Sequence, residues 1–457
     1  MIRLFNIYCP TRLLVLVFGE SLVVCSSFVL AAMLRLGSDS LLVLAYERGI
    51  YKILLVTALV LVLMHFFDLY DSTRAPSGGD TQYRLLVVVG LLAFSLAGLG
   101  YVFPGFMLRK STFLFGLFIL SFALSGWRSG YAWLIRRPSL REGVCVLGRG
   151  YLANRLVETL RARPELGMDV VEWLGAVGNG SMDHENLQDS ILDSMRPGNV
   201  ARVIVALGDR RGVMPARALL GLRLKGVKVD DATSFLERIS GRIEVDGLYP
   251  SWLIFSDGFR LTPFNLFWQR ASSIIASFLC LLVLLPIMPL IALMIKLDSP
   301  GPVIYRQKRI GRGGRIFDCH KFRTMREDAE ATGAVWANED DPRVTRVGRW
   351  LRKMRVDEVP QLWNVLRGDM ALVGPRPERT EFVEWLSHEI PYYYVRHIIR
   401  PGITGWAQVC YHYGASLEDS KEKLKYDLFY IKNMSLGLDL AIILRSIKIV
   451  ILGRGSR

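Results

Sequence analysis

Four long apolar segments occupy the first 135 residues, and polar turns separate them. They run over Leu13–Leu36, Ile50–Phe67, Leu85–Phe103 and Thr112–Trp127. Each has roughly the 17–25 residues that an α-helix needs to cross the hydrocarbon core of a bilayer. The first is too long for a cleaved signal peptide and lacks a small-residue cleavage site. The pattern therefore predicts a four-helix transmembrane domain over residues 1–135.

Basic residues flank this predicted bundle at both ends. Arg3 and Arg12 precede the first apolar segment, and Arg128, Arg137 and Arg141 follow the fourth. Because Lys and Arg accumulate in cytoplasmic loops, both ends of the bundle are predicted to lie in the cytoplasm. An even number of crossings agrees with that orientation.

Two ionisable residues, Glu20 and His65, lie at membrane depth. Such residues are costly in lipid and can mark a path for ions or substrates. The sequence shows no partner for either of them. We therefore interpret them as helix-packing or interfacial residues, with a functional path as the alternative.

Beyond residue 140, short apolar runs alternate with glycine turns and helical stretches. A buried strand is predicted over Gly143–Gly148, followed by a helix over Asn154–Arg163. Further strands are predicted over Val170–Leu174, Ala201–Leu207 and Lys225–Val229. Strand, glycine turn and helix open a Rossmann-type unit, so we predict a Rossmann-like α/β domain over residues 140–250. A lone glycine fingerprint is weak evidence for a dinucleotide, which favours a structural or oligomerisation domain.

A fifth apolar run, Ala271–Ile295, has no charged residue and is long enough to cross a membrane. Pro286 and Pro289 lie in its middle, and proline disfavours a straight helix. Arg270 and Lys296 flank it, so a crossing would carry a basic region outward, against the positive-inside rule. We predict a re-entrant helix over about residues 265–297, broken at Pro286. An ordinary fifth span is the alternative.

Composition adds the expectation of an anionic partner. The chain has 457 residues, of which 51% are hydrophobic, and a net charge of +15. A chain this apolar can bury a core, which excludes intrinsic disorder. Its six cysteines are scattered without a CxxC pair, which argues against a disulfide scaffold and a zinc site. The positive charge is unusual for a simple membrane bundle and indicates anionic ligands.

The positive charge is concentrated in the last third of the chain. From residue 298 onward, Lys and Arg outnumber Asp and Glu by 27 to 20. Arg and Lys bind phosphate oxygens, and glycines let backbone N–H groups approach an anion. The turn Gly374–Pro377 would hold Arg376 in a fixed direction, because prolines on both sides restrict it. These phrases predict a phosphate-rich ligand. Nucleic acid is disfavoured, because no helix-turn-helix, RNA-recognition or zinc-finger pattern occurs.

Two adjacent carboxylates, Asp357 and Glu358, lie in this basic region. Arg352 and Arg355 precede them on a short helical phrase closed by Pro360. Neighbouring cations keep carboxylates ionised, an ionised aspartate can attack phosphorus, and a second carboxylate can hold Mg²⁺. The local pattern alone favours a plainer interpretation, a pair of solvated carboxylates on a helix surface.

At these phrases the sequence resembles the bacterial polyprenyl-phosphate hexose-1-phosphate transferases, the initiating bacterial sugar transferases. The resemblance covers about residues 265–457, where the family's phrases occur in order: KLDSPGPVIYRQKRIG, KFRTM, DEVPQLWNVLRGDMALVGPRPE, RPGITGWAQV and YDLFYIKNMSLGLDLAIILRSIKIV. The whole layout is similar to the large members with four N-terminal spans, and within those to the exopolysaccharide and exosortase-associated subgroup. The predicted fold class is thus a membrane protein with a transmembrane bundle, a Rossmann-like domain and a mostly helical catalytic domain.

The resemblance implies transfer of a sugar 1-phosphate from a UDP-sugar to undecaprenyl phosphate, with release of UMP, at the cytoplasmic face of the bacterial inner membrane. It implies that Asp357 is the nucleophile and that Glu358 binds Mg²⁺. Its substrate-binding positions correspond to Lys321, Arg323, Arg352, Asp369, Arg376 and Arg400. Pro286 matches the break in the family's re-entrant helix, and a homodimer is compatible with the family's large members. The resemblance reverses the interpretation of the acidic pair as a plain surface feature.

The sequence departs from the family at two places. Leu285 precedes Pro286 where the family often has serine, and Cys410–Gly414 stands where many members read Asn-Gly-Arg. The choice of sugar therefore stays open. Two other functions also stay open: a non-catalytic scaffold or regulator of polysaccharide export, which needs no Asp357, and a membrane-anchored nucleotide-sugar epimerase, whose chemistry would lie near Gly148–Ala153.

Overall fold

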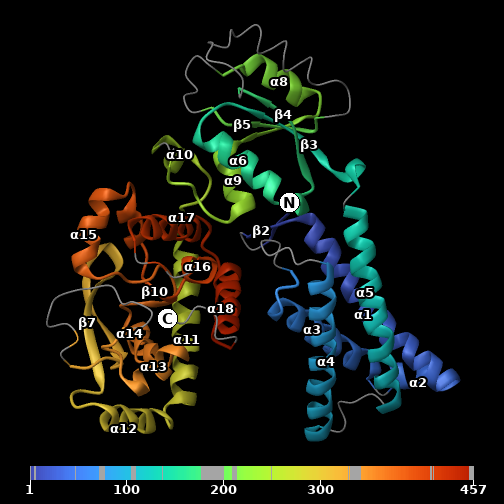
Figure 1. Cartoon of the computed structure of the whole chain (residues 1–457), viewed down its shortest axis with the longest axis horizontal. Coiled ribbons are helices and arrows are strands. Elements are labelled where there is room, and N and C mark those ends of the chain that lie inside the picture. The colour runs from blue at the N-terminus through green and yellow to red at the C-terminus, as the bar shows by residue number, and fades with distance from the viewer. Residues whose placement is uncertain are drawn as a thin grey trace. The chain divides into compact units, whose positions relative to one another are not determined.

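The computed structural model describes residues 2–451, apart from 5–6, 47, 71–77, 104–109, 136, 176–199, 208–213, 247, 249, 328, 330–340, 412–413 and 415. Contacts group the chain into two compact units (Figure 1). One comprises residues 1–2 and 9–232, and the other residues 3–8 and 233–457. The three-domain organisation drawn from the sequence stays a prediction. His412 and Tyr413, which belong to the departure at 410–414, lie outside the described residues.

The first unit begins with the predicted apolar helices. They are α1 (Thr11–Leu36), α3 (Gly49–Phe66), α4 (Gly78–Val102) and α5 (Lys110–Ile135). A 3₁₀ turn (Gly37–Asp39) and the short helix α2 (Ser40–Ala45) follow α1 and were not predicted. Two short strands, β1 (Ile2–Leu4) and β2 (Ile7–Cys9), pair before α1. The four apolar helices are thus confirmed, although α4 begins seven residues earlier and α5 ends eight residues later than predicted.

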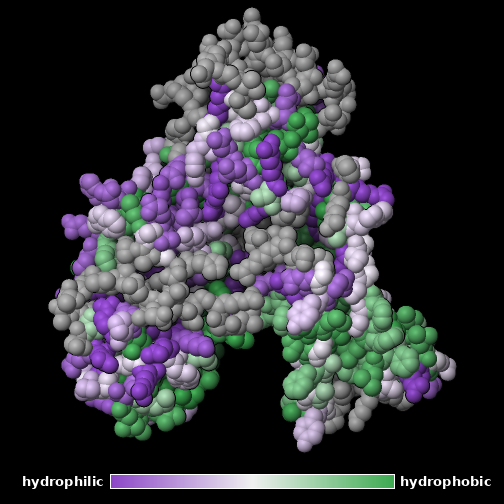
Figure 2. All heavy atoms as spheres, in the orientation of Figure 1, coloured by the Kyte–Doolittle hydropathy of each residue, from purple (hydrophilic) through white to green (hydrophobic). Residues whose placement is uncertain are grey.

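Apolar side chains of these helices lie both in the core between the helices and on their exposed faces. Phe28 of α1 stacks on Phe113 of α5 at 6.3 Å between ring centroids and is fully buried. Phe94 and Phe118 point outward and are 80% and 64% exposed. Figure 2 shows apolar residues over the outer surface of these helices. Helices that are hydrophobic all round are typical of membrane spans, and within the described residues five helices are long and apolar enough to cross one, the fifth being Pro263–Leu284. The protein is a multi-pass membrane protein.

Glu20 has the partner that the sequence did not reveal. Its carboxylate accepts hydrogen bonds from Arg128 Nε at 2.6 Å and from the Tyr70 hydroxyl at 2.5 Å. Arg128 also donates from Nη1 to the Leu69 carbonyl at 2.9 Å. A buried carboxylate held by a guanidinium and a hydroxyl has its charge compensated. Glu20 therefore joins α1 to α5, which supports the helix-packing interpretation.

The first unit ends in a parallel sheet of four strands in the order β4-β3-β5-β6. The strands are β3 (Glu142–Leu147), β4 (Met168–Leu174), β5 (Arg202–Val205) and β6 (Lys228–Asp231), and the helices α6 (Tyr151–Ala162) and α8 (Ala216–Leu224) accompany them. The central strand β3 is buried from Val144 to Leu147, as expected for a strand covered on both faces. The parallel strands and the helices between them agree with the α/β organisation predicted for this region, and a Rossmann-like domain stays a prediction.

The glycine turn after β3 packs backbone against backbone. A Cβ on Gly148 would lie 2.3 Å from the Ala206 carbonyl oxygen, and one on Gly175 would lie 2.8 Å from the Gly148 oxygen. Trp173 Nε1 donates a hydrogen bond to the same Gly148 oxygen at 3.0 Å. Close approach of three chain segments is sufficient reason for these glycines. Backbone packing therefore accounts for Gly148 and Gly175, whereas Gly150, with φ 93°, has open space at its Cβ position. A structural role for this domain stays a prediction.

The second unit is mostly helical. Its helices are α9 (Ala232–Ser240), α10 (Pro250–Phe255), α11 (Pro263–Leu284), α12 (Met288–Asp298), α13 (Arg346–Lys353), α14 (Gln361–Arg367), α15 (Thr380–Glu389), α16 (Trp406–Cys410), α17 (Leu417–Asn433) and α18 (Leu436–Ile451). Its strands are the antiparallel hairpin β7 (Ile304–Ile310) and β8 (Ile316–Phe322), and the short parallel pair β9 (Ala371–Val373) and β10 (Gly402–Thr404).

The fifth apolar run is broken after α11. Pro286 has no N–H to continue the helix, and the next amide, Ile287 N, bonds the Leu284 carbonyl at 2.9 Å in a tight turn. Pro289 lies in the first turn of α12, where proline is compatible with helix. Only Pro286 therefore breaks the helix, although Leu285 replaces the serine that often precedes it in the family.

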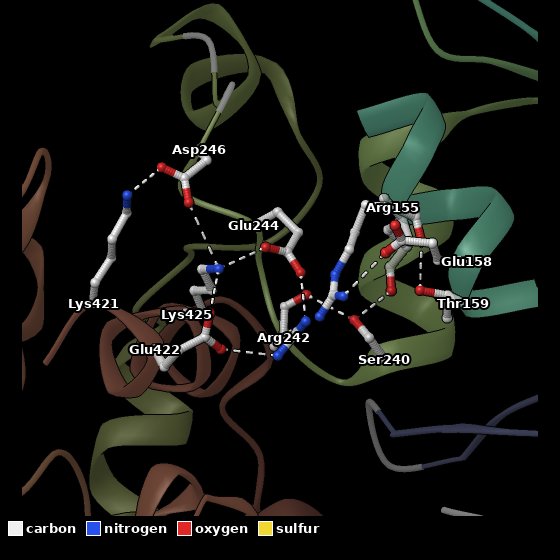
Figure 3. Close-up of polar contacts among 11 residues, drawn as sticks. Arg155, Glu158, Thr159, Ser240, Arg242, Glu244, Asp246, Lys421, Glu422 and Lys425 are labelled. Carbon is white, nitrogen blue, oxygen red and sulfur yellow. Dashed lines mark hydrogen bonds and ion pairs between the residues drawn. The ribbon is translucent and has the colours of Figure 1, made fainter. Parts of the chain in front are cut away.

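The segment between α9 and α11 is joined to α17 by buried charges. Glu237 of α9 accepts from Lys432 Nζ at 2.5 Å. Glu244 pairs with Lys425 Nζ at 2.8 Å, and Arg242 bridges Glu244 and Glu422, each at 2.9 Å (Figure 3). Removing one partner of such buried pairs strongly destabilises a fold. Residues 233–262 are thus an integral part of the second unit.

Candidate active site

Asp357 and Glu358 lie on a 3₁₀ turn, Val356–Glu358, between α13 and α14. The sequence had placed them on one helical phrase closed by Pro360, and that prediction was wrong. Arg355 adopts the left-handed conformation with φ 56°, which ends α13, and Pro360 begins the next helix. A left-handed non-glycine residue costs on the order of 1–3 kcal/mol and is found where surrounding structure imposes it.

Contacts with Thr324 position the helix before the acidic pair. Gly348 of α13 packs on the Thr324 backbone so closely that a Cβ would lie 2.1 Å from its carbonyl oxygen. The same oxygen accepts from Thr345 N at 3.0 Å, and the Thr345 hydroxyl caps α13 by accepting from Gly348 N at 3.0 Å. Arg352 Nε donates to the Thr324 hydroxyl at 2.9 Å. The segment around Thr324 therefore fixes the position of α13 and the orientation of the Arg352 side chain.

Glu358 is surrounded by cations. Its Oε1 accepts from Arg376 Nη2 at 2.8 Å and lies 3.5 Å from Lys321 Nζ, while Oε2 lies 3.9 Å from Arg355 Nη1. The residue is 7% exposed. Burial alone would raise the pKa of this carboxyl, but the charges of Arg376, Lys321 and Arg355 outweigh it and hold the pKa well below its ordinary value. Glu358 is therefore ionised at neutral pH.

Asp357 is in the opposite situation. Burial and the neighbouring Glu358 charge raise its pKa above the ordinary value, against the opposing effect of Lys321, Arg352 and Arg376. No described residue makes a hydrogen bond or ion pair with its carboxylate. A carboxylate without a partner, beside cations, is available to react with an anionic substrate that those cations attract.

A shallow surface depression, partly open to solvent, adjoins this cluster. Its lining residues are Arg309, Cys319, Lys321, Gln361, Arg376 and Pro377. Two of them, Lys321 and Arg376, also hold Glu358. Sequence reasoning missed Arg309, Cys319 and Gln361. The first two could have been found from the alternation of the β7–β8 hairpin, since Arg309, Cys319 and Lys321 share one face of it.

The donor chemistry around the pair is compatible with Mg²⁺. Among the described residues, no group of three or more His, Cys, Asp or Glu side chains forms a metal cluster. Mg²⁺ is commonly held by one or two carboxylates together with substrate phosphates and water. Glu358, the predicted ligand, would hold the ion with Asp357 adjacent, and incoming phosphates would compete for Lys321 and Arg376.

The remaining predicted residues lie elsewhere. Arg323 is 6% exposed and donates from Nη2 to the Ser299 carbonyl at 2.6 Å and hydroxyl at 3.1 Å. Arg400 Nε donates to the Gly368 carbonyl at 3.1 Å, and Asp369 accepts from Asn364 at 3.3 Å. These last contacts lie at the far end of α14, a helix about 10 Å long at 1.5 Å per residue. The structure thus brings Lys321, Arg352 and Arg376 to the acidic pair, but not the other three.

One polar residue that the sequence did not single out couples these elements. Asn364 of α14 is fully buried. Its Oδ1 accepts from His320 N at 3.0 Å, and its Nδ2 donates to the Asp318 carbonyl at 2.8 Å. A fully bonded buried amide fixes orientation. Asn364 therefore holds α14 against β8, the strand that carries Lys321.

One protein family and three individual proteins are similar in sequence to this chain. The profile of the family described as "Bacterial sugar transferase" matches residues 264–453. The UDP-N-acetylgalactosamine-undecaprenyl-phosphate N-acetylgalactosaminephosphotransferase of Aeromonas hydrophila is 42% identical over 53% of this chain and 56% of its own length. The undecaprenyl-phosphate glucose phosphotransferase of Komagataeibacter xylinus is 35% identical over 69% of this chain and 60% of its own length.

A third relative matches over nearly its whole length. The UDP-glucose:undecaprenyl-phosphate glucose-1-phosphate transferase of Escherichia coli (strain K12) is 32% identical over 86% of this chain and 88% of its own length. The chain thus spans somewhat more than half the length of the first two relatives and most of the third. It belongs to the bacterial sugar transferase family.

Proposed function

We propose that this protein transfers a sugar 1-phosphate from a UDP-sugar to undecaprenyl phosphate, releases UMP and so initiates exopolysaccharide or related glycan synthesis. The observation that carries the proposal is Asp357, whose carboxylate has no hydrogen-bond or ion-pair partner among the described residues and lies beside Glu358 and the cations Lys321, Arg352 and Arg376. The names of the three relatives describe this class of reaction for those proteins.

In the first step, a carboxylate oxygen of Asp357 attacks the phosphorus that bears the sugar. A bond forms between that oxygen and phosphorus, and the bond from this phosphorus to the bridging oxygen breaks. UMP leaves with the bonding electron pair, so no proton has to move. Lys321 and Arg376 are placed to offset the charge that gathers on the leaving phosphate. The product is a sugar phosphate joined to Asp357.

In the second step, a phosphate oxygen of undecaprenyl phosphate attacks the same phosphorus. The acyl-phosphate bond breaks and Asp357 is released as a carboxylate, ready for another turnover. Arg352, held by Thr324, is the residue that we assign to the lipid phosphate. A Mg²⁺ ion held by Glu358, with Asp357 adjacent, would neutralise phosphate oxygens during both steps. Lys321 and Arg376 keep Glu358 ionised for that purpose.

The same proposal includes the membrane arrangement. Residues 1–135 span the inner membrane four times, residues 140–250 form a Rossmann-like domain, and residues 265–457 form the catalytic domain on the cytoplasmic face. Helices α11 and α12 enter and leave on that face, which the break at Pro286 and the basic flanks Arg270 and Lys296 support. A homodimer is the proposed assembly, by resemblance to large members of the family.

The decisive experiment is UMP release from a UDP-sugar with undecaprenyl phosphate and Mg²⁺. Wild type should release UMP, and without the lipid acceptor its mass should increase by one sugar phosphate. Asp357→Ala should lose both signals, whereas the control Glu381→Ala, on an exposed carboxylate of α15, should keep them. UMP release by Asp357→Ala at the wild-type rate would overturn the nucleophile assignment. No UMP release by wild type from any UDP-sugar would favour the scaffold.

Topology has its own test. A reporter enzyme fused after Arg457 should be active only in the cytoplasm if α11 and α12 form a re-entrant pair. A reporter active on the opposite side would show that the fifth apolar run is an ordinary span.

A further inference from the structure

The turn Pro375–Pro377, which carries Arg376, and the residue after it, Glu378, are held through their carbonyl groups. Four successive carbonyl oxygens each accept a hydrogen bond: Pro375 from Gly402 N at 2.9 Å, Arg376 from Arg396 Nη2 at 3.1 Å, Pro377 from Arg309 Nη1 at 2.9 Å and Glu378 from Ile310 N at 3.1 Å. Two of the four residues are prolines and have no N–H of their own to donate. The conformation of the turn is therefore imposed from outside it.

Of these four donors, Arg396 is the one that binds the backbone of Arg376 itself. The side chain of Arg376 reaches Glu358 Oε1 at 2.8 Å, while its carbonyl oxygen is held by Arg396. Prolines on both sides restrict the backbone between these two attachments. A displacement of the carbonyl would consequently displace the guanidinium that holds Glu358.

Arg396 is itself held inside the second unit. It lies in the 3₁₀ segment Tyr393–His397 and is 5% exposed. Its Nη2 lies 2.9 Å from Asp427 Oδ2 on α17, and its Nη1 donates to the Tyr393 hydroxyl at 2.5 Å and lies 3.7 Å from Glu378 Oε1. A planar guanidinium can hold a carboxylate and a carbonyl at once in fixed directions, which a lysine ammonium cannot do with the same geometry.

We infer that Arg396 is a positioning residue for the transfer reaction: it fixes the turn Pro375–Pro377 and thereby the direction of Arg376 toward Glu358. The inference rests on the proposed function, because Arg376 is assigned there to the leaving phosphate. Arg396 touches neither the acidic pair nor, in this assignment, the substrate. Its contribution to rate is transmitted through Arg376.

The test compares Arg396→Lys with a matched variant, Arg242→Lys. Arg242 is also a part-buried arginine between two carboxylates, Glu244 and Glu422, but it belongs to the network that joins residues 241–246 to α17 (Figure 3). Arg396→Lys should lower kcat on the order of 10²-fold, the loss expected when a catalytic group is misplaced by about 1 Å. Arg242→Lys should leave kcat unchanged, even if both variants unfold at a lower temperature.

A second background shows whether the effect passes through Arg376. In Arg376→Ala protein there is no guanidinium left to direct, so adding Arg396→Lys should change kcat less than twofold. Residues that act as a unit are non-additive in this way. A full additional loss in that background, or wild-type kcat for Arg396→Lys alone, would overturn the inference and assign Arg396 to general stability or to no role.

Amide hydrogen exchange gives a readout that does not depend on catalysis. Peptides that cover residues 373–379 should exchange faster in Arg396→Lys than in wild type, and should be unchanged in Arg242→Lys. Unchanged exchange in Arg396→Lys would refute the fastening of the turn, whether or not UMP is released. Absence of UMP release by wild type would instead refute the proposed function, and faster exchange would still identify Arg396 as the residue that holds the turn.

Discussion

Both units contain a buried glutamate held by an arginine, and the two pairs differ in how completely their charges are matched. In the membrane bundle, both oxygens of Glu20 are bonded, one by Arg128 and one by Tyr70, and the carboxylate is fully buried. In the second unit, Glu358 has Arg376 at 2.8 Å, but further cations surround it and a depression adjoins it.

The comparison shows how a structural pair can be told from a functional one. A matched pair offers nothing to a ligand, because every charge already has its partner within the fold. At Glu358, three basic side chains lie within 3.9 Å of the carboxylate, and the adjacent Asp357 has no hydrogen-bond or ion-pair partner among the described residues. Several cations gathered beside a depression are the arrangement that attracts an anionic substrate.

Among variants of the two buried glutamates, the largest effect on kcat is expected from Glu358→Gln. The variant removes the charge that Lys321 and Arg376 hold, and with it the proposed Mg²⁺ ligand. Removing one preorganised electrostatic group costs on the order of 10²–10³ in kcat. UMP release measures this loss, and the thermal unfolding midpoint should change little, because the side chains of Lys321 and Arg376 are 21% and 29% exposed and their charges stay partly hydrated. A large drop in stability with unchanged kcat per folded molecule would make Glu358 a structural residue like Glu20.

The converse is expected for Glu20→Gln. It leaves Arg128 buried beside an uncharged amide, and breaking a buried pair in this way costs about 3–5 kcal/mol. The unfolding midpoint in detergent should fall, while kcat of the protein that remains folded should match wild type. The double variant Glu20→Gln/Arg128→Met should be more stable than Glu20→Gln alone, because no unpaired charge is left. A selective loss of kcat would instead revive a functional path through Glu20.

The pH dependence should separate Asp357 from Glu358. Asp357 has a raised pKa and must be ionised to attack, so kcat/KM should fall as pH decreases through that pKa. Glu358 stays ionised in the same range because its pKa is held low, so the acid limb of log kcat/KM should have a slope of one. A slope of two would show that both carboxylates titrate together.

Two variants should move that acid limb in opposite directions. Arg376→Ala removes a cation that lowers the pKa of Asp357, so the limb should shift to higher pH. In Glu358→Gln, the neighbouring negative charge that raises this pKa is gone, so the residual activity should decline only at lower pH. Shifts in the same direction would show that the limb does not report Asp357.

Much of this organisation could be predicted from the sequence, because it depends on local pattern. The apolar helices, the parallel strands and the break at Pro286 each follow from hydropathy or from the geometry of proline. The acidic pair was conspicuous among its basic neighbours, but the family resemblance, rather than that local pattern, led to its interpretation as a site. Arg323 could not be placed in this way: β8 ends at Phe322, where Arg323 N bonds the Val303 carbonyl at 2.9 Å, so the alternation that aims Lys321 at Glu358 no longer applies.

The contacts between chain segments that are far apart in sequence could not be predicted from the sequence either. Gly374 and Gly402 pack so closely that a Cβ on Gly402 would lie 2.1 Å from Gly374 N, and this contact pairs β9 with β10. Arg396 is twenty residues from the carbonyl it holds. No periodicity links such positions, because loop closure and packing, rather than local propensity, bring them together.

The smallest effect is expected where a charge pair is exposed. Lys421 pairs with Asp246 at the edge of the network in Figure 3, and the two side chains are 34% and 37% exposed. Exposed pairs contribute about 0.2–1 kcal/mol and weaken with salt. Lys421→Gln should therefore lower the unfolding midpoint only slightly, and the difference should shrink in 1 M salt, where screening is short-ranged. Lys425→Gln, which removes one of the two cations held by the buried Glu244 in the same network, should cost several times more and should be insensitive to salt. Equal costs for the two variants would show that burial does not set the strength of these pairs, and the contrast drawn between Glu20 and Glu358 would then rest on charge balance alone.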